Sequence, residues 1–120
     1  MSAPDIWAYR ARLVRVIDGD TMDLVIDAGF RSTREERVRL LGVNTPEVKG
    51  ATRQAGVAAR TFVEDWLSRA AEGDEWPLIV QTHKGDAFGR YLARLWRRSD
   101  GACLNDTLLM AGHAVVFMAD

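Results

Sequence analysis

Hydrophobic and polar residues alternate along the first part of the chain. In residues 7–17, WAYRARLVRVI, one set of alternate positions is mostly apolar and arginines occupy the other, as is typical of a half-buried strand. The alternation slips near Val14, which predicts a bulge that bends this strand. The strand pattern returns in MDLVID (22–27) and ERVRLLGV (36–43), with a polar turn, AGFRST (28–33), between them. These segments predict an antiparallel meander.

The spacing of apolar residues changes to that of a helix in residues 51–73. One face of this helix is expected to carry the residues that pack on the core, and Gly73 is expected to end it. The expected core-facing residues are Ala55, Ala59, Phe62, Val63, Trp66, Leu67 and Ala70.

Two more strands and a second helix are predicted in the rest of the chain. The strands are WPLIVQTH (76–83) and RYLARLWRR (90–98), joined by a glycine-bounded loop at 84–89. LNDTLLMAGHA then predicts a short helix, with Asn105 or a neighbour near its cap and Gly112 near its end.

This order of elements predicts a mixed α+β fold that is mainly β. Three strands, a helix, two strands and a helix fit a small five-stranded OB-type Greek-key barrel with two helices. An open antiparallel sheet with the helix laid across it is the alternative. With 120 residues, 48% of them hydrophobic, residues 1–120 are expected to form one domain that buries roughly two-thirds of its unfolded surface.

Composition narrows the possible partners and compartments. The net charge is −1, so overall charge does not indicate a nucleic-acid binder and any anion site must be local. Lys49 and Lys84 are the only lysines among 16 basic residues, and the arginines suit bidentate contact with phosphate.

Cys103 is the single cysteine, which excludes an intramolecular disulfide and a four-thiolate zinc site. Without a signal-peptide pattern or a membrane-length apolar stretch, we expect a cytoplasmic protein that does not contact membranes.

Three polar segments carry candidate chemistry, and each also has a purely structural interpretation. Asp18-Gly19-Asp20-Thr21 is a hairpin signal, because a primed turn needs residues that tolerate positive φ, but it also places an acid where a strand leaves the turn. Asn44-Thr45-Pro46-Glu47 has the signature of a helix start, with Thr45 as the cap and Pro46 at the first helical position. Gly85 to Arg90 is a loop whose arginine could be merely solvated. Arg39 is harder to treat as a solvated residue because it interrupts an apolar run.

Together these residues form a coherent chemical set. Oxygen donors from Asp20, Asn44 and the Thr45 carbonyl could hold Ca²⁺ or a similar cation. The guanidinium groups of Arg39 and Arg90 could grip a phosphate. The Glu47 carboxylate would remain to orient or deprotonate a water molecule.

The order of VIDGDT, RLLGVNTPE, FGRYLARLW and LNDTLLMAGHA resembles the staphylococcal nuclease-like (thermonuclease) family over residues 12–116. The resemblance implies a calcium-dependent endonuclease that hydrolyses phosphodiester bonds of DNA, RNA or both and leaves 3′-phosphate ends.

The resemblance also implies a role for each candidate residue. Asp20 and Asn44 match metal ligands, and Thr45 would add its backbone carbonyl. Glu47 matches the acid that holds the attacking water. Asp18 would support the site without binding the metal itself. The phosphate-binding arginines are matched by Arg39 and Arg90.

The sequence departs from the family pattern at several positions. Asn44 stands where the best-known members carry aspartate, so calcium binding is expected to be weaker, because charged ligands largely set calcium affinity. Phe88 and Ala87 stand where the family often has tyrosine and lysine, and Asp86 is expected to be only a turn acid. With the last residue at Asp120, we expect the third helix of longer members to be missing or reduced. The alternative function is a catalytically weak or inactive OB-type module that binds nucleic acid or a protein.

Overall fold

Five strands close into a barrel in the order β1-β2-β3-β6-β5 in the computed structural model of the protein, which describes residues 7–70, 73–83 and 90–117. Neighbouring strands are antiparallel except β3 and β6, which run parallel. The strands of the barrel are β1 (Ala8–Asp18), β2 (Thr21–Asp27), β3 (Thr33–Leu40), β5 (Leu78–His83) and β6 (Tyr91–Arg97). The predicted five-stranded barrel is therefore confirmed, and the open sheet is wrong.

The third predicted strand, 36–43, is split in two. β3 stops at Leu40, and Gly42 turns the chain with a φ of 79°, a conformation that glycine adopts without steric cost. The next residues form the short strand β4 (Val43–Asn44), which leaves the barrel and pairs with β7 (Val115–Val116). The predicted bulge in β1 is confirmed, because the β1–β2 register shifts between Leu13 and Arg15.

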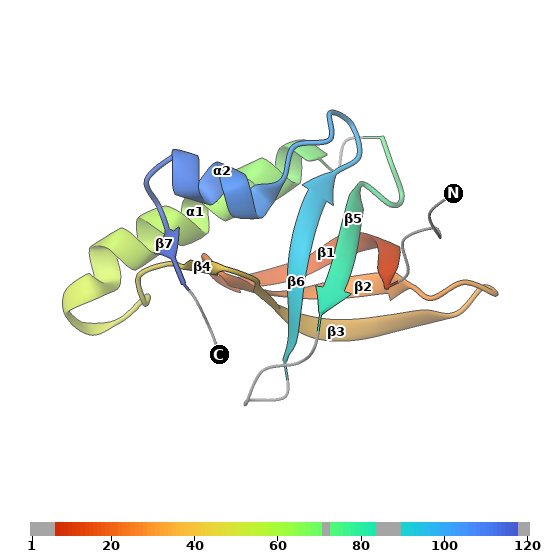
Figure 1. Cartoon of the computed structure of the whole chain (residues 1–120), viewed down its shortest axis with the longest axis horizontal. Helices are drawn as coiled ribbons and strands as arrows, with labels where there is room; N and C mark the ends of the chain where they lie inside the picture. The colour runs from red at the N-terminus through yellow and green to blue at the C-terminus, as the bar shows by residue number, and fades with distance from the viewer. Residues whose placement is uncertain (1–6, 71–72, 84–89, 118–120) are drawn as a thin grey trace, which may run out of the picture.

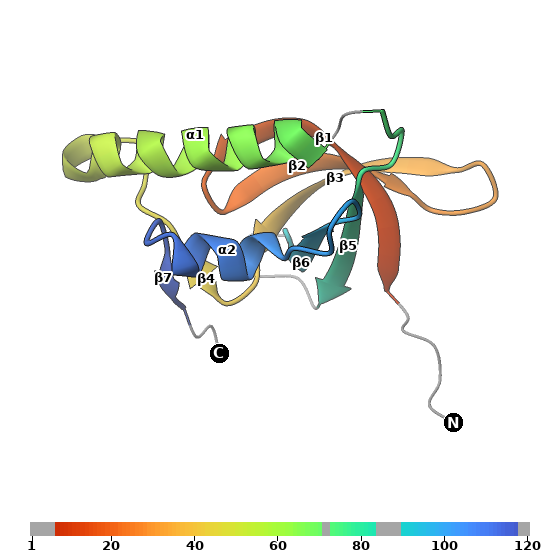
Figure 2. The ribbon, with the colours of Figure 1, turned by 90° about the horizontal axis from the view of Figure 1, so that it is seen from above.

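The two helices lie at one end of the barrel, and the β2–β3 hairpin projects from the other end (Figures 1 and 2). A 3-10 turn, η1 (Gly50–Thr52), leads into α1 (Arg53–Ala70), and α2 is Leu104–Met110. The predicted core face of α1 is largely correct, but Ala55 is exposed and Gly56 is buried in its place. Neither helix combines the length and apolar character needed to cross a bilayer in the part of the chain that is described.

Asn105 lies in the first turn of α2, near the cap as predicted, while Cys103 occupies the cap position itself and the Asn105 side chain is buried. The Asn105 Oδ1 accepts a hydrogen bond from the Leu95 amide at 3.1 Å, and its Nδ2 donates to the carbonyl oxygens of Leu41 at 2.9 Å and Ala93 at 3.1 Å. A local cap pattern cannot reveal these distant partners. Asn105 thus ties α2 to β6 and to the turn that follows β3.

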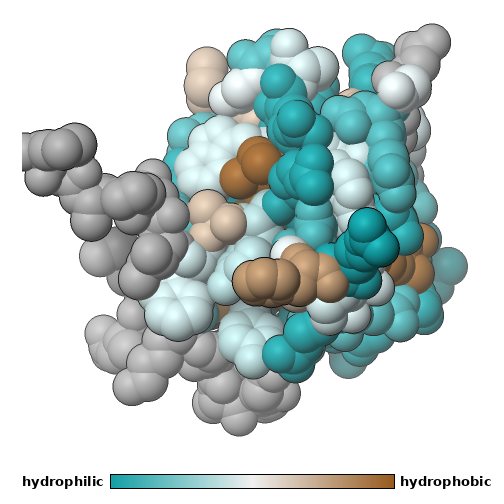
Figure 3. Space-filling view, turned by 90° about the vertical axis from the view of Figure 1, so that its right-hand side faces the viewer, coloured by the Kyte–Doolittle hydropathy of each residue, from teal (hydrophilic) through white to brown (hydrophobic). Residues whose placement is uncertain are grey.

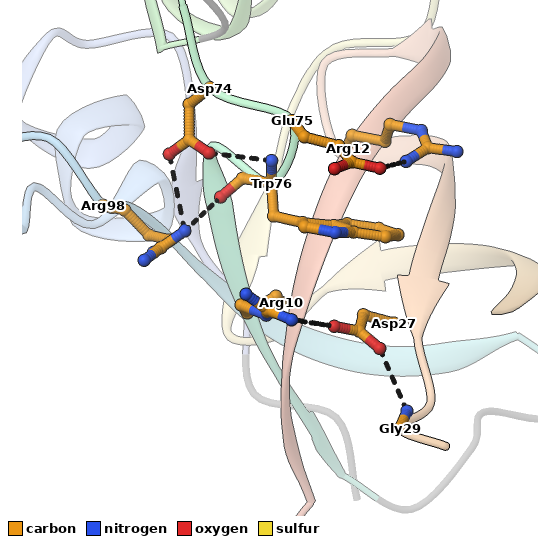
Figure 4. Close-up of polar contacts among 8 residues, drawn as sticks. All are labelled: Arg10, Arg12, Asp27, Gly29, Asp74, Glu75, Trp76 and Arg98. Atoms are coloured by element: carbon orange, nitrogen blue, oxygen red, sulfur yellow. Dashed lines mark hydrogen bonds and ion pairs between the residues drawn. The ribbon is translucent and has the colours of Figure 1, made fainter. Parts of the chain in front are cut away.

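Arginine side chains connect β1 to the end of β2 and to the segment before β5 (Figure 4). Arg10 forms an ion pair with Asp27 at the end of β2. The Arg12 guanidinium lies 4.4 Å from the centre of the Trp76 ring, and Arg98 donates a hydrogen bond of 2.8 Å to the Trp76 carbonyl oxygen. These contacts hold the segment before β5 against the barrel.

An ion cluster crosses the outer face of β1, β2 and β3. Asp23 lies opposite Arg15 on one side and Arg37 on the other, and its side chain is only 10% exposed. Arg37 donates to both Asp23 carboxylate oxygens, at 2.8 and 3.1 Å, and the Arg15 Nε lies 3.4 Å away. The hydrogen bonds from Arg37, together with the charges of both arginines, hold the pKa of Asp23 below its ordinary value of 3.8.

Replacing this carboxylate is expected to give a pH-dependent loss of stability. Asp23→Asn should lower the free energy of unfolding at pH 7 by roughly 1–2 kcal/mol, because charge-assisted hydrogen bonds are lost between the strands. The folded pKa is lowered, so the stabilisation is present above pH 3.8 and is lost as the pH falls through the folded pKa. Urea unfolding at pH 7 and through the acid range measures the difference between the two proteins.

The control is Asp65→Asn, which removes an exposed ion pair with Arg69 on α1. Its effect should stay below about 0.5 kcal/mol, as for exposed helical pairs in general. A difference between the unaltered protein and Asp23→Asn that does not shrink on acidification would contradict the electrostatic explanation.

Candidate active site

The predicted hairpin turn between β1 and β2 is confirmed, but its predicted backbone geometry is wrong. The turn has two residues and is closed by the pair Asp18 and Thr21, and none of its residues has a positive φ. Glycine is required at position 19 for space. A Cβ on Gly19 would lie 2.8 Å from Thr45 Oγ1 and 3.0 Å from the Ala59 side chain. The turn therefore packs directly against the loop after β4 and against α1.

Asp20 is both a turn residue and a buried acid, with 6% of its surface exposed. Its Oδ1 accepts a hydrogen bond from the Thr21 hydroxyl at 3.1 Å, and its Oδ2 accepts one from the Thr45 amide at 3.0 Å. The same Oδ2 lies 3.4 Å from Arg39 Nη2. The Asp20 carbonyl oxygen also accepts a hydrogen bond of 2.8 Å from the Leu40 amide. Asp20 thus joins β2, β3 and the loop after β4.

Arg39 is the centre of the polar cluster, and its side chain is 11% exposed. Its Nη1 donates to the carbonyl oxygens of Leu40 at 2.7 Å and Val43 at 2.8 Å. Its Nη2 donates to Asn44 Oδ1 at 3.0 Å and also faces Asp20. Two of the predicted metal ligands, Asp20 and Asn44, therefore direct an oxygen at the same nitrogen atom.

The segment from Asn44 to Glu47 is not the start of a helix. The helical turn begins only at Gly50, and its cap residue, Lys49, makes no side-chain capping hydrogen bond. Thr45 does not act as a cap, because its hydroxyl, the group that would accept from a helix amide, is buried against the β1–β2 turn. Its amide is bound to Asp20. Within the described residues, Thr45 Oγ1 is a buried oxygen without a hydrogen-bond partner.

Glu47 is exposed, and its position is fixed through its backbone. The Thr52 hydroxyl donates a hydrogen bond of 2.8 Å to the Glu47 carbonyl oxygen. Gly56 of α1 lies against the same peptide, and a Cβ there would clash with the Glu47 carbonyl and come within 2.8 Å of Val48 N. Among the described residues, the Glu47 carboxylate makes no hydrogen bond or ion pair.

Arg90 reaches the cluster through Thr21. Its Nη1 lies 3.5 Å from Thr21 Oγ1, at the upper limit of hydrogen-bond length. Hydrogen bonds and an ion pair thus connect four predicted residues, Asp20, Arg39, Asn44 and Thr45. Thr21 connects this group to Arg90. The predictions for Asp86, Ala87 and Phe88 lie outside the described residues.

The two aspartates of the turn have pKa values that shift in opposite directions. Burial, the hydrogen bond to Asp20 and the charge of Asp20 raise the pKa of Asp18 to about 6. Burial also disfavours the charged form of Asp20, but hydrogen bonds from Asp18 and the Thr45 amide, with the Arg39 charge, outweigh it and lower the pKa of Asp20. Asp20 therefore ionises first as the pH rises, and Asp18 follows near pH 6, so both are charged at neutral pH. Asp18 Oδ1 also accepts a hydrogen bond of 3.3 Å from the Asp20 amide.

The donor set fits a cation that prefers oxygen ligands. Asp20 supplies a carboxylate and Asn44 an amide oxygen, and both already lie against a positive group, Arg39 Nη2. Carboxylate, amide and carbonyl oxygens are the ligands of Ca²⁺. No group of three His, Cys, Asp or Glu side chains gathers in the described part of the chain, so the site would hold such a cation with little protein charge.

Three residues that support this site were not predicted from the sequence. Thr21 links Arg90 to Asp20, and Gly56 supports Glu47. Phe117 lies under Arg39, with its ring centre 5.4 Å from the guanidinium carbon, and its amide donates to the Gly42 carbonyl oxygen. Gly56 left a signal, because glycine within an alanine-rich helix is unfavourable unless packing requires it.

Comparison with known proteins places these residues in a family context. The family model described as "Staphylococcal nuclease homologue" matches residues 37–120. A thermonuclease of Staphylococcus intermedius is 37% identical over 98 residues, which cover 79% of this chain and 53% of that protein. Protein ParB of Escherichia coli is 32% identical over 95 residues, or 78% of this chain and 46% of ParB.

A third relative is an uncharacterised protein, MJ1439, of Methanocaldococcus jannaschii. It is 25% identical over 131 residues, which cover 93% of this chain and 61% of that protein. The chain thus spans about half the length of the curated relatives that it matches.

The contact of Gly56 with the Glu47 peptide predicts a reversal of the usual helix preference. Replacing glycine by alanine inside a helix normally stabilises it by roughly 0.5–1 kcal/mol. Gly56→Ala should instead destabilise the protein by roughly 1–3 kcal/mol, as overpacking does, because the new methyl group meets backbone atoms. Thermal and urea unfolding measure this change.

The exposed helix position Ala58 provides the control. Ala58→Gly should cost about 1 kcal/mol from helix propensity alone. A Gly56→Ala variant more stable than the unaltered protein would show that the loop carrying Glu47 does not depend on this contact.

Proposed function

The chain belongs to the staphylococcal nuclease homologue family, and from this premise we propose that it is a calcium-dependent endonuclease that hydrolyses phosphodiester bonds of DNA, RNA or both. The observation that carries the proposal is the contact of the Arg39 guanidinium with the buried Asp20 carboxylate and the exposed Asn44 amide, three residues before Glu47 in the chain. A cluster of this kind offers one place for a cation and one for a phosphate.

Arg39 and Arg90 are proposed to bind the phosphate group that is cut. The two hydrogen bonds from Arg39 Nη1 to backbone oxygens fix the direction of its guanidinium before substrate arrives. Preorganised donors of this kind stabilise developing charge at little reorganisation cost. Arg90 would add a second guanidinium from the neighbouring strand, since it lies within reach of Thr21 at the same site.

Glu47 is proposed to orient or deprotonate the attacking water. Its carboxylate is exposed and so is accessible to substrate and water, and its backbone is anchored by Thr52 and Gly56. A general base must be held within hydrogen-bond reach of the proton that it takes, so fixing its backbone favours this role.

Asp20, Asn44 and the Thr45 carbonyl are proposed to hold Ca²⁺. When bound, the ion would polarise a phosphate oxygen and offset negative charge on the phosphate. Arg39 Nη2 contacts the Asp20 and Asn44 oxygens in the absence of a cation, so a bound ion would have to replace these two contacts while the hydrogen bonds of Nη1 keep the guanidinium in place.

Removing the proposed base tests the catalytic assignment. Glu47→Gln should lower kcat by roughly 10²- to 10⁴-fold, as expected for loss of general-base catalysis, while the apparent calcium affinity stays unchanged. Cleavage of single-stranded and double-stranded nucleic acid across a calcium titration provides the measurement. Glu64→Gln, on the exposed side of α1, is the matched control and should retain full activity.

Full turnover by Glu47→Gln would contradict the role of Glu47. Binding of nucleic acid without cleavage, by unaltered folded protein at any calcium concentration, would instead favour the binding-module alternative.

Restoring a charged ligand tests the metal assignment. Asn44→Asp should lower the half-saturating calcium concentration by roughly tenfold or more, since one added charge at about 4 Å contributes several kcal/mol before desolvation is subtracted. The calcium dependence of cleavage and of the melting temperature gives two independent readouts. An unchanged calcium requirement in both would show that position 44 does not contact the ion.

A further inference from the structure

The barrel has an open mouth at the end that carries the β2–β3 hairpin, and this mouth forms a hollow of about 300 Å³. Figure 3 views the molecule from the side of the hairpin, where brown apolar and pale side chains are exposed among teal ones. The hollow is lined by residues at or beside the starts of β1, β3 and β6 and the ends of β2 and β5. Its volume lies at the lower end of the range of small-ligand sites.

The hollow is separate from the candidate active site. Val38 lines the hollow, whereas Arg39, the next residue of β3, lies on the opposite face, because successive side chains of a strand alternate. The proposed nuclease function therefore assigns no role to the hollow.

Three aromatic side chains line the hollow, those of Trp7, Tyr9 and Tyr91. Trp7 and Tyr9 lie just before and in β1, Tyr91 begins β6, and β5 with Thr82 runs between these two strands. Trp7 is 61% exposed and Tyr91 is 40% exposed. Within the described part of the chain, none of the three rings stacks on another ring or on a guanidinium, so their faces are available to a ligand.

The backbone of Trp7 is held in an unusual conformation. Its φ is 65°, in the left-handed region that bulky residues rarely adopt. The Thr82 amide donates a hydrogen bond of 2.9 Å to the Trp7 carbonyl oxygen, and the Thr82 hydroxyl donates one of 3.3 Å. Such conformations persist only where surrounding contacts enforce them, and they concentrate at functional sites. Thr82 thus fixes the backbone that carries the indole at the mouth.

The β3 wall of the hollow carries an ion pair. Arg34 and Glu36 both line the hollow, with Arg34 Nη2 at 2.6 Å from Glu36 Oε2. The Glu36 side chain is 25% exposed and that of Arg34 is 64% exposed, so the carboxylate is the more deeply placed of the two. The lining therefore contains a shielded carboxylate whose counter-ion extends toward solvent.

Aromatic faces and a carboxylate together favour a cation. The face of an aromatic ring is electron-rich and attracts a cation that lies within about 6 Å of its centre. An ordinary ammonium group carries three N–H donors that need acceptors, and the lining residues Ala28, Ile26 and Val38 offer only apolar side chains. A methylated ammonium group has few or no N–H donors, and its methyl groups suit apolar walls and ring faces.

We propose that the mouth of the barrel binds a methylated ammonium group, such as that of choline or of an Nε-trimethyllysine side chain. The rings of Trp7, Tyr9 and Tyr91 contact the methyl groups, and the Glu36 carboxylate offsets the positive charge. This binding requires neither calcium nor the residues of the candidate active site.

Choline and its neutral isostere, in which a carbon atom replaces the nitrogen, separate cation binding from simple apolar binding. Each compound is titrated into the unaltered protein without calcium, and the protein amide shifts are followed by NMR. Choline should bind with a Kd of roughly 1 mM or below, and the isostere about tenfold more weakly or worse, because it has the same shape without the charge. The N-methyl proton signal of choline should also move upfield, as it does above the face of a ring.

Ring variants test which residues form the site. Trp7→Leu and Tyr91→Leu each replace a ring by an apolar side chain, and each should weaken choline binding by roughly tenfold. Tyr91→Phe retains the ring and should stay within about twofold of the unaltered protein. Phe30→Leu removes an exposed ring at the β2–β3 turn, outside the hollow, and should leave binding unchanged. Circular dichroism checks that each variant is folded, and the two leucine variants test the site independently.

Two peptides that differ only in the trimethylation of one lysine distinguish the sources of the group. The trimethylated peptide should bind more tightly than the unmodified one. If it also binds more tightly than choline, the ligand is a modified protein, and the reverse order identifies a small molecule.

Three results would overturn the proposal. Equal binding of choline and its neutral isostere would show that the hollow is only an apolar cavity. Failure of the folded, unaltered protein to bind choline or the trimethylated peptide would exclude the site. Choline binding that is unchanged in both Trp7→Leu and Tyr91→Leu would place the bound cation elsewhere on the protein.

Discussion

Burial of the Asp20 carboxylate is the constraint on which the site depends. A buried carboxylate is costly unless hydrogen bonds and positive charge compensate it. Here the compensating groups come from two other segments, the Thr45 amide after β4 and the Arg39 guanidinium at the end of β3. Satisfying one charge therefore requires three separate parts of the chain to meet at one point, and that point is also where a cation and a phosphate could be bound.

Close backbone packing around this carboxylate explains two glycines. Gly19 allows the β1–β2 turn to approach Thr45 and Ala59, and Gly56 allows α1 to approach the Glu47 peptide. Asn105 fixes the Leu41 carbonyl just beyond Arg39, so α2 also supports the cluster. The exposed groups proposed to act on substrate are thus carried by a backbone that is packed against both helices, which favours a preorganised site.

The sequence predicted the barrel well because its strands alternate clearly, and even the bulge near Val14 left a visible slip. It failed where distant contacts override local preference. Thr45-Pro46 has the local signature of a helix start, yet Asp20 holds the Thr45 amide. Asn105 lies near the cap of α2 as predicted, yet its side-chain partners lie on β6 and after β3 and could not be read from the local pattern. The candidate residues Asp20, Asn44, Thr45 and Arg39 were predicted from chemistry and do meet, whereas Thr21 and Phe117 carried no recognisable signal.

The most direct test of this account is the melting temperature as a function of calcium concentration, for the unaltered protein and for Asp20→Asn. A ligand that binds only the folded state stabilises it by about 1.4 kcal/mol for each tenfold increase in concentration above its Kd. The account predicts that calcium raises the melting temperature of the unaltered protein and leaves that of Asp20→Asn unchanged, with magnesium less effective. An equal rise in both proteins would contradict the assignment of Asp20 as the ligand around which the site is built.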